Sequence, residues 1–366
     1  MNKSELFSKF KSINKNDSIL LLTHNDMDGA GSPILLEVLG FTNVKTYHLS
    51  NNYMSESIVK NVTGPYAKYY DHIIAVDISA NEKDCEIINK SPNKDKLMIF
   101  DHHNTAAHLN NYSFGVMYGD MISDSFRTKY YKPEDLSKAH TSGTALFYDY
   151  LESKGITDSI KNLTPGFVNF NWGIIPDFVQ KVSGYDTWDW HDLLNEDQAY
   201  KDLDMVEEIY GLDIFKEVMI NKLKNGYDLI SNEEKLLLRI ENSKIDTYLK
   251  GARKNYKVGT VELNGRDYSI CMYTGGKYIG EVFEDMKTEH PEVELYLINS
   301  GMHMSLRTDK EGIDVGAIAK SVSKNGGGHI GAAGFKVDDE MQIDYISRAL
   351  GSEVELIDEE ERSWSF

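Results

Sequence analysis

Three clusters of acidic and imidazole side chains follow apolar runs in the first third of the chain. They are His24, Asp26 and Asp28 in HNDMDG, then Asp77 in AVDIS, then the triplet Asp101, His102 and His103. Carboxylates that lie together repel one another, and a divalent metal ion relieves that repulsion. Oxygen ligands with some histidine suit Mn²⁺, Mg²⁺ or Fe²⁺ better than a thiolate-type zinc site does. Two metals about 3.5–4 Å apart can generate a hydroxide and polarise a phosphoryl group at once, which is chemistry that such clusters could support.

The elements that would hold these clusters alternate between strands and helices. Apolar runs predict strands at 18–24, 44–50, 72–79 and 96–103. Helical patterns lie between them at 29–40, 55–64 and 82–90. This alternation is typical of parallel strands joined by right-handed crossovers in an open α/β sheet. Ligands bind beyond the carboxyl ends of such strands, so all three clusters should meet at one edge. Taken singly, Asp77 could equally be a turn former and His24 a hydrogen-bonded histidine.

The rest of the chain predicts a helical connector and a second, smaller α/β domain. Helices are expected at 142–155, in part of 167–188, and over a charged region from 202 to 254. Strands are then expected at 256–263, 268–273 and 293–300, and helices are expected at 314–324 and near 340–350. We therefore expect an N-terminal domain at 1–200, a helical connector at 201–255, a smaller domain at 256–350 and an acidic tail at 351–366.

A glycine-rich segment in the smaller domain is a candidate phosphate-binding site. It reads Gly326, Gly327, Gly328 and His329 within NGGGHIGAAGF. Glycines let the backbone approach a phosphate, and exposed N–H groups can form an anion-binding concavity. Arg307, in SLRTD, could add a bidentate phosphate contact. A flexible turn is the alternative explanation of the glycines, and a surface position is the alternative for Arg307.

The composition of the chain limits the classes of binding partner that are expected. Its 366 residues include 58 acidic and 39 basic ones, for a net charge of −19. This balance argues against stable binding of duplex DNA, which needs a basic face, but it allows a small phosphorylated substrate held by metal ions. No apolar run suits a membrane span or a signal peptide, and two cysteines make no disulfide framework. We expect a cytoplasmic protein, and the sequence leaves a homodimer open.

The motifs, taken in order, resemble those of the DHH/DHHA1 phosphoesterase family, within the nanoRNase/RecJ-like superfamily. HNDMDG is similar to its first motif, Asp77 to its second, and Asp101-His102-His103 to the triplet that names it. Asp186, in SGYDTWDW, is similar to the fourth motif, and GGGHIGAAGF with Arg307 resembles the glycine-rich signature of the DHHA1 domain. The likeness extends from about residue 18 to 350. It implies a DHH catalytic domain followed by a DHHA1 substrate-binding domain.

The resemblance also implies roles for these residues. Two divalent metal ions are expected, most often Mn²⁺, with Mg²⁺ also open. One metal would be held by His24, Asp26 and Asp77, and the other by Asp28, Asp77, His102 and Asp186. His103 would face the substrate phosphate with support from Asp101, while Arg307, His329 and the Gly326–Gly328 backbone would hold the substrate. The spacing of His24 and Asp26 is shorter than in nanoRNase-type members.

The activity that the resemblance implies is hydrolysis of short single-stranded oligonucleotides to nucleoside 5′-monophosphates by a metal-activated water. Several alternatives share the motifs. They are a single-strand exonuclease of RecJ type, cleavage of linear or cyclic dinucleotides, and phosphate removal from adenosine 3′,5′-bisphosphate. A protein that only binds nucleotides is the alternative outside catalysis, and the complete set of expected ligand types disfavours it.

Overall fold

Two units, each with its own β-sheet, make up the chain in the computed structural model. Contacts divide it into residues Met1–Leu238 and Arg239–Phe366. The structure describes residues 3–50, 53–122, 127–157, 173–195, 197–263, 265–323, 326–328 and 330–337. The predicted helix near 340–350, the predicted acidic tail at 351–366, His329 and residues 167–172 lie outside these ranges.

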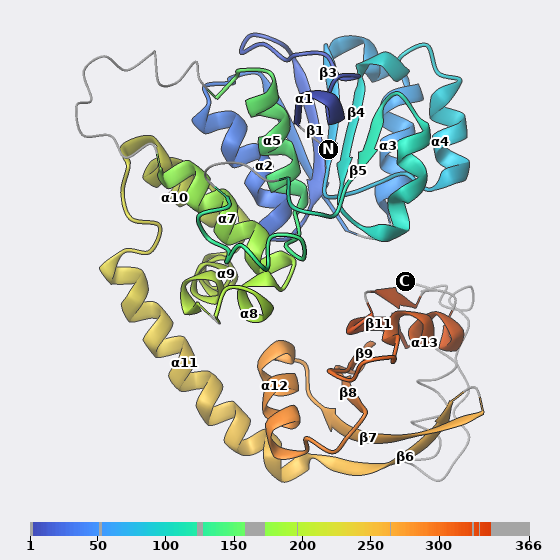
Figure 1. Ribbon diagram of the computed structural model, residues 1–366, viewed down its shortest axis with the longest axis vertical. Helices are drawn as coiled ribbons and strands as arrows, with labels where there is room; N and C mark the ends of the chain where they lie inside the picture. Colours follow the sequence, from blue (N-terminus) through green and yellow to red (C-terminus); the bar gives the residue numbers. More distant parts are fainter. Residues whose placement is uncertain are drawn as a thin grey trace, which may run out of the picture. The chain divides into compact units, whose positions relative to one another are not determined.

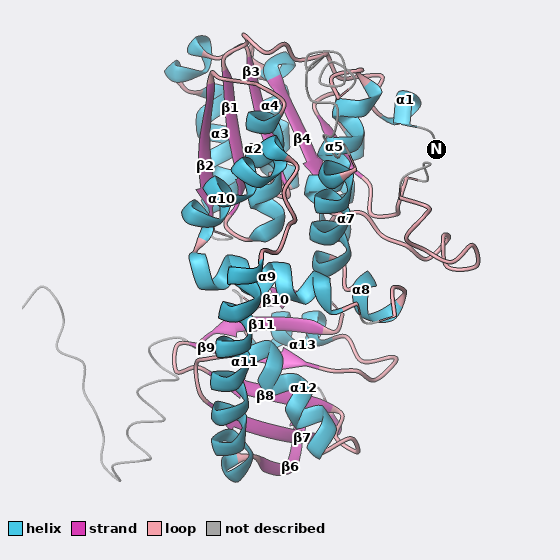
Figure 2. Ribbon diagram, turned by 90° about the vertical axis from the view of Figure 1, so that its left-hand side faces the viewer, coloured by secondary structure: helices cyan, strands magenta, loops and turns pink. Residues whose placement is uncertain are grey.

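The N-terminal unit contains a parallel sheet in which five strands are described, in the order β2-β1-β3-β4-β5 (Figures 1 and 2). The strands are β1 (Ile19–His24), β2 (Val44–Leu49), β3 (His72–Val76), β4 (Leu97–Asp101) and β5 (Gly115–Met117). The helices are α1 (Lys3–Leu6), α2 (Met27–Val38), α3 (Met54–Thr63), α4 (Glu82–Asn89), α5 (Gly143–Ser153), α7 (Ile174–Asp186), α8 (Asp189–Asp192), α9 (Gln198–Tyr210) and α10 (Leu212–Asn225). The predicted α/β architecture is confirmed.

Both faces of this sheet are covered, which explains why its central strands are apolar throughout. Leu20 and Leu22 of β1 pack with Ile58 and Val62 of α3 in a core on one face. On the other face, the ring of Phe100 in β4 lies against Phe147 of α5, with the centroids 5.4 Å apart. Figure 1 shows α3 and α4 on one side of the strands, and α2 and α5 on the other.

Among the predicted boundaries that differ from the structure, two are set by candidate ligands. The helix predicted from Gly29 begins at Met27, because Asp26 caps it by accepting a hydrogen bond from the Gly29 amide at 2.8 Å. The strand predicted to run to Ser79 ends at Val76, because Asp77 takes the left-handed conformation with φ 61°. The chain therefore leaves the sheet at the candidate ligands themselves.

The C-terminal unit has a mixed sheet, with the described strands in the order β10-β11-β9-β8-β7-β6. Its elements are β6 (Lys257–Leu263), β7 (Arg266–Thr274), α12 (Ile279–Glu289), β8 (Leu295–Asn299), β9 (His303–Arg307), α13 (Val315–Val322), β10 (Gly327–Gly328) and β11 (Ala332–Lys336). β7 and β8 are parallel, and the other pairs are antiparallel. Helix α12 was not predicted. The long helix α11 (Asn232–Ala252) spans the division between the units.

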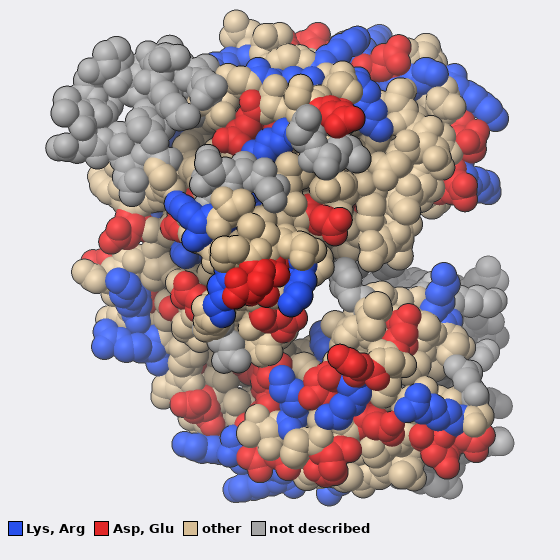
Figure 3. Space-filling view, in the orientation of Figure 1, with Lys and Arg blue, Asp and Glu red and all other residues tan. Residues whose placement is uncertain are grey.

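Charge and hydropathy of the described residues agree with the sequence. None of the described helices is both long and apolar enough to cross a membrane. On the face seen in Figure 3, lysine and arginine side chains are interspersed with aspartate and glutamate.

Candidate metal centre

Strand register brings the three predicted clusters together. Thr23 of β1 pairs with Val76 of β3, and Val76 pairs in turn with Phe100 of β4. The next residue of each strand is therefore His24, Asp77 and Asp101, side by side at the carboxyl edge of the sheet. Asp186, at the end of α7, reaches the same place, with its Oδ2 atom 3.4 Å from Nε2 of His102. All eight residues predicted from the N-terminal unit converge there.

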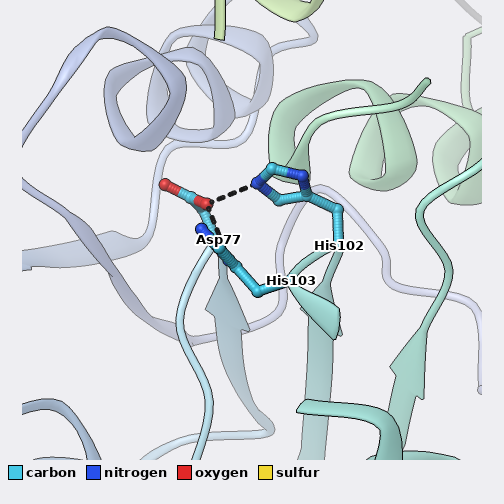
Figure 4. A group of neighbouring side chains, drawn as sticks. All are labelled: Asp77, His102 and His103. Carbon is cyan, nitrogen blue, oxygen red and sulfur yellow. Dashed lines mark ion pairs between the residues drawn. The ribbon is translucent and has the colours of Figure 1, made fainter. Parts of the chain in front are cut away.

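Asp77 is the centre of this arrangement. Its side chain is buried, and its two oxygens face different partners. Oδ1 lies 3.2 Å from Nε2 of His102 and 3.9 Å from Nδ1 of His103 (Figure 4). Oδ2 lies 3.8 Å from Nδ1 of His24. Aspartate tolerates the left-handed conformation better than most residues, and its amide still donates to the carbonyl of Phe100 at 2.9 Å.

Ligand-type atoms gather in three overlapping groups at this edge. Within each group, one atom from each side chain lies within 4.8 Å of the others. The groups are His24, Asp26 and Asp77; Asp28, His102 and Asp186; and Asp77, His102 and His103. The first group is one of the two ligand sets that the family resemblance implies. The second group holds three of the four residues of the other set, and the fourth, Asp77, groups with His102 in the third.

His103 and Asp101 form a hydrogen-bonded pair. Asp101 Oδ1 accepts from the backbone amide of His103 at 2.9 Å and lies 2.8 Å from its Nδ1. Burial alone would raise the pKa of Asp101, but these hydrogen bonds bring it below its ordinary value. Burial would lower the pKa of His103, and the Asp101 carboxylate outweighs this and raises it. The pair therefore favours a protonated imidazole at the edge of the site.

The other carboxylates repel one another. Burial, then the charges of Asp28, Asp26 and Asp186, raise the pKa of Asp77 well above its ordinary value. Desolvation within the acidic cluster, followed by the charges of Asp28 and Asp26, raises the pKa of Asp186 to about 7, although its side chain keeps some contact with solvent. Burial also raises the pKa of Asp28. Such shifts indicate a site that needs positive charge.

A divalent cation fits the residues present. Asp77 Oδ1 and His102 Nε2 are buried, and neither has a hydrogen-bond partner among the described residues. Buried polar atoms are normally satisfied, so these two require either protons or a metal. Four carboxylates with imidazole nitrogens form a donor set that suits Mn²⁺ or Mg²⁺.

Asp28 is held by the N-terminus of α5, a contact that the sequence did not predict. Its carboxylate accepts hydrogen bonds from the Ser142 hydroxyl at 2.6 Å, the Gly143 amide at 2.8 Å and the Thr144 amide at 3.0 Å. Amides at a helix N-terminus stabilise a negative charge. We call Ser142, Gly143 and Thr144 the Asp28 clamp. A Ser residue before a helix signals an N-cap, but it does not reveal a partner more than a hundred residues away.

Comparisons with known proteins agree with this geometry. Residues 276–356 match the family model of the DHHA1 domain. Oligoribonuclease NrnB of Bacillus subtilis (strain 168) is 26% identical over 334 residues, covering 90% of this chain and 75% of that protein. These matches add to two earlier observations, namely the four sequence motifs and the convergence of their residues at one edge of the sheet. Together they support a DHH/DHHA1 phosphoesterase. The named relatives indicate a DHH-family hydrolase, as the sequence motifs predicted.

Two solved structures are also similar over most of the chain. The pGpG-specific phosphodiesterase PggH from Vibrio cholerae has 12% identity and a TM-score of 0.42, with 91% of this chain and 97% of that chain covered. RecJ from Thermus thermophilus in complex with Mn²⁺ has 13% identity and a TM-score of 0.45, with 95% and 53% covered. At these scores the likeness carries no argument about function.

Packing within the DHHA1 domain requires two of the three clustered glycines. Gly328 has φ 142°, and a Cβ atom there would lie 2.5 Å from the carbonyl oxygen of Ala332. A Cβ on Gly326 would lie 2.0 Å from the carbonyl oxygen of Ala319. Gly327, by contrast, faces open space. The Arg307 guanidinium donates to the carbonyls of Leu306 at 3.0 Å and Ala333 at 3.2 Å, so it also supports the pairing of β9 with β11.

Proposed function

We propose that this chain is a metal-dependent phosphodiesterase that hydrolyses short oligonucleotides to nucleoside 5′-monophosphates. The observation that carries the proposal is the buried Asp77 carboxylate, whose two oxygens face two groups of ligand-type side chains. This arrangement suits a carboxylate that bridges two cations. The similarity to oligoribonuclease NrnB over 90% of the chain supports short oligonucleotides as the substrate class.

The ligand assignment is the one that the family resemblance implies. His24, Asp26 and Asp77 would hold one cation, and Asp28, Asp77, His102 and Asp186 would hold the other; the grouping of Asp28, His102 and Asp186 and the 3.2 Å between Asp77 Oδ1 and His102 Nε2 support it. Cations bound there would neutralise the phosphate charge and lower the pKa of a water molecule. Asp28 is fixed by its clamp and Asp101 orients His103, so these ligands need little reorganisation when a substrate arrives.

His103 is the side chain that we assign to the substrate phosphate. Its ring is one-third exposed, whereas the Asp101 carboxylate that orients it is buried. A protonated imidazole donates hydrogen bonds to phosphate oxygens and offsets the charge that develops during hydrolysis. In the DHHA1 domain, we assign Arg307, His329 and the backbone of Gly326, Gly327 and Gly328 to substrate binding.

A product-resolved assay tests this function. Purified protein with Mn²⁺ would be offered a dinucleotide, a five-nucleotide RNA, a longer single-stranded DNA and adenosine 3′,5′-bisphosphate in parallel. We expect EDTA-sensitive conversion of the two short oligonucleotides to mononucleotides. Preference for the long DNA would indicate a RecJ-type exonuclease, and release of phosphate from the bisphosphate would indicate a nucleotide phosphatase. Metal binding without any turnover would leave a nucleotide-binding protein.

Arg307→Ala tests the assignment of Arg307 to substrate binding. We expect KM to rise about tenfold or more, because a charge-assisted contact with phosphate is lost, while kcat changes little. Arg266→Ala is the matched control, since Arg266 lies in the same sheet and pairs with Glu294 at 2.8 Å on the surface. An unchanged KM in Arg307→Ala would restrict that arginine to its backbone contacts with Leu306 and Ala333.

A further inference from the structure

Trp188 stands in an unusual backbone position beside the metal centre. It follows Asp186 by two residues and has φ 66° and ψ 5°, the left-handed conformation. Its amide donates to the carbonyl of Tyr185 at 3.1 Å, where α7 ends. Helices commonly end with one residue in this conformation, and that residue is usually glycine because a side chain there is strained. A tryptophan is therefore rare at such a position.

The segment around Trp188 is anchored on both sides. On one side, Asp186 belongs to the ligand group with Asp28 and His102. On the other side, the buried carboxylate of Asp189 lies 2.7 Å from Nδ1 of His140 and accepts from its backbone amide at 2.8 Å. The Tyr131 hydroxyl donates to the same carboxylate at 3.0 Å. Strained residues persist where the surroundings over-determine them, and they gather at functional sites.

Packing does not account for the indole. Trp188 is 40% exposed, whereas neighbouring Trp190 is 8% exposed and belongs to the core. The Trp188 ring stands edge-on to Trp190, with the centroids 5.5 Å apart and the planes at 73°. It is stacked with His191 at 5.5 Å and 28°. These two rings hold the indole in place while much of its surface stays open to solvent.

A nucleobase is the planar group that this surface suits. We propose that Trp188 is a stacking platform for a base of the substrate whose phosphate lies at the metal centre. The inference rests on the proposed function, because an oligonucleotide carries a base within a few bonds of each scissile phosphate. Aromatic side chains stack on any base, so one tryptophan serves substrates of mixed sequence. The adjoining residues Thr187, His191 and Asp192, which are at least partly exposed, are polar, which disfavours an apolar protein-docking face.

Trp188→Gly separates this role from a structural one. Glycine prefers the left-handed conformation, so the variant removes the stacking surface and relieves the backbone strain together. We expect its thermal midpoint to stay within a few degrees of the wild type, and its affinity for a dinucleotide to fall about 5- to 150-fold, the equivalent of ~1–3 kcal/mol per stacked base. Trp188→Phe should keep most of the affinity. Tyr66→Ala, which removes another exposed aromatic ring, should leave affinity unchanged.

The decisive comparison uses ligands that differ only in the base. Binding of adenosine 5′-monophosphate and of ribose 5-phosphate would be measured in Mn²⁺ by calorimetry. The wild type should prefer the nucleotide, and Trp188→Gly should lose that preference while still binding the sugar phosphate. An equal preference in both proteins would overturn the inference, whatever the turnover assay shows. If Trp188→Gly does not fold, Trp188→Asn takes its place, because asparagine also tolerates the left-handed conformation.

Discussion

At the scale of single residues, Asp77 has the most demanding position in the molecule. It is buried among Asp26, Asp28 and Asp186, and it takes a backbone conformation that most residues avoid. Neither its charge nor its φ angle favours the metal-free fold. The natural explanation is that Asp77 serves the cations rather than the stability of the chain.

Asp77→Ala should therefore abolish turnover with little loss of fold. The substitution removes the atoms that face both ligand groups, so we expect at least a ~10³-fold fall in kcat and the loss of one Mn²⁺ per chain. The metal-free thermal midpoint should stay equal or rise, because a repulsive buried charge is gone. Activity, calorimetric Mn²⁺ titration and melting would be measured together. Asp71→Ala, at an exposed aspartate, is the control, and substantial activity in Asp77→Ala would refute the bridging role.

The raised pKa values predict how pH affects the metal-free protein. The pKa of Asp186 lies at about 7 and that of Asp77 is well above its ordinary value, so the folded state binds more protons than the unfolded state. Their stabilising contribution is complete below about pH 4, and it is lost as pH rises through about 7 for Asp186. Asp101 and Asp26 have lowered pKa values, so their opposite contribution changes only in acid.

The free energy of unfolding of the metal-free protein should consequently fall between pH 5 and 8, by an amount on the order of 1 kcal/mol. Mn²⁺ should reverse the trend, because metal binding displaces the protons. The measurement is a series of melts in EDTA and in Mn²⁺, with Asp186→Asn as the variant that flattens the EDTA profile. A metal-free protein that becomes more stable toward pH 8 would contradict the arrangement of charges described here.

At the scale of elements, the sequence predicts the sheet well because strand patterns are local. The strands predicted at 18–24, 44–50, 72–79 and 96–103 correspond to β1, β2, β3 and β4. The short strand β5 was missed, since three residues carry almost no periodicity. Convergence of His24, Asp77 and Asp101 followed from the sheet rule alone. The position of Asp186 did not, because it comes from a helix and rested on the family resemblance.

Helix α5 shows what sequence reasoning could not supply. The range 142–155 was correctly predicted as helical, but its first residues also form the Asp28 clamp. That contact depends on how α5 packs against α2 and β3, which periodicity does not describe. Gly143 illustrates the point, because a Cβ there would lie 2.6 Å from the Cβ of Asp77.

Gly143→Ala should therefore disturb the metal centre through an element rather than a ligand. The added methyl group meets the Asp77 backbone at 2.8 Å, so α5 must shift. We expect a loss of about 1–3 kcal/mol in stability and at least a ~10-fold weaker Mn²⁺ affinity. Gly251→Ala in α11 is the control, because a Cβ there meets nothing within 4 Å and alanine favours the helix. Wild-type Mn²⁺ affinity in Gly143→Ala would show that α5 does not position the ligands.

At the scale of the whole molecule, the two units have separate hydrophobic cores, and the metal centre belongs to the first. Cations should therefore stabilise one unit selectively. In scanning calorimetry, Mn²⁺ at 100 times its dissociation constant should stabilise the N-terminal unit by about 2.7 kcal/mol and leave the C-terminal unit unchanged. Val293→Ala, in a buried core position of the C-terminal unit, would identify the second transition by lowering it. Equal shifts of both transitions would place a cation site in each unit.

The proposed ligands of the metal centre lie far apart along the chain, so the ribosome makes them at different times. His24, Asp26 and Asp28 leave the ribosome early, while Asp186 emerges only after all five strands of the described sheet have been made. A nascent chain therefore carries its acidic cluster through most of the N-terminal unit's translation without the last of the proposed ligands. The second cation should therefore bind late in folding, after the sheet has assembled, and should not nucleate the folding of the sheet.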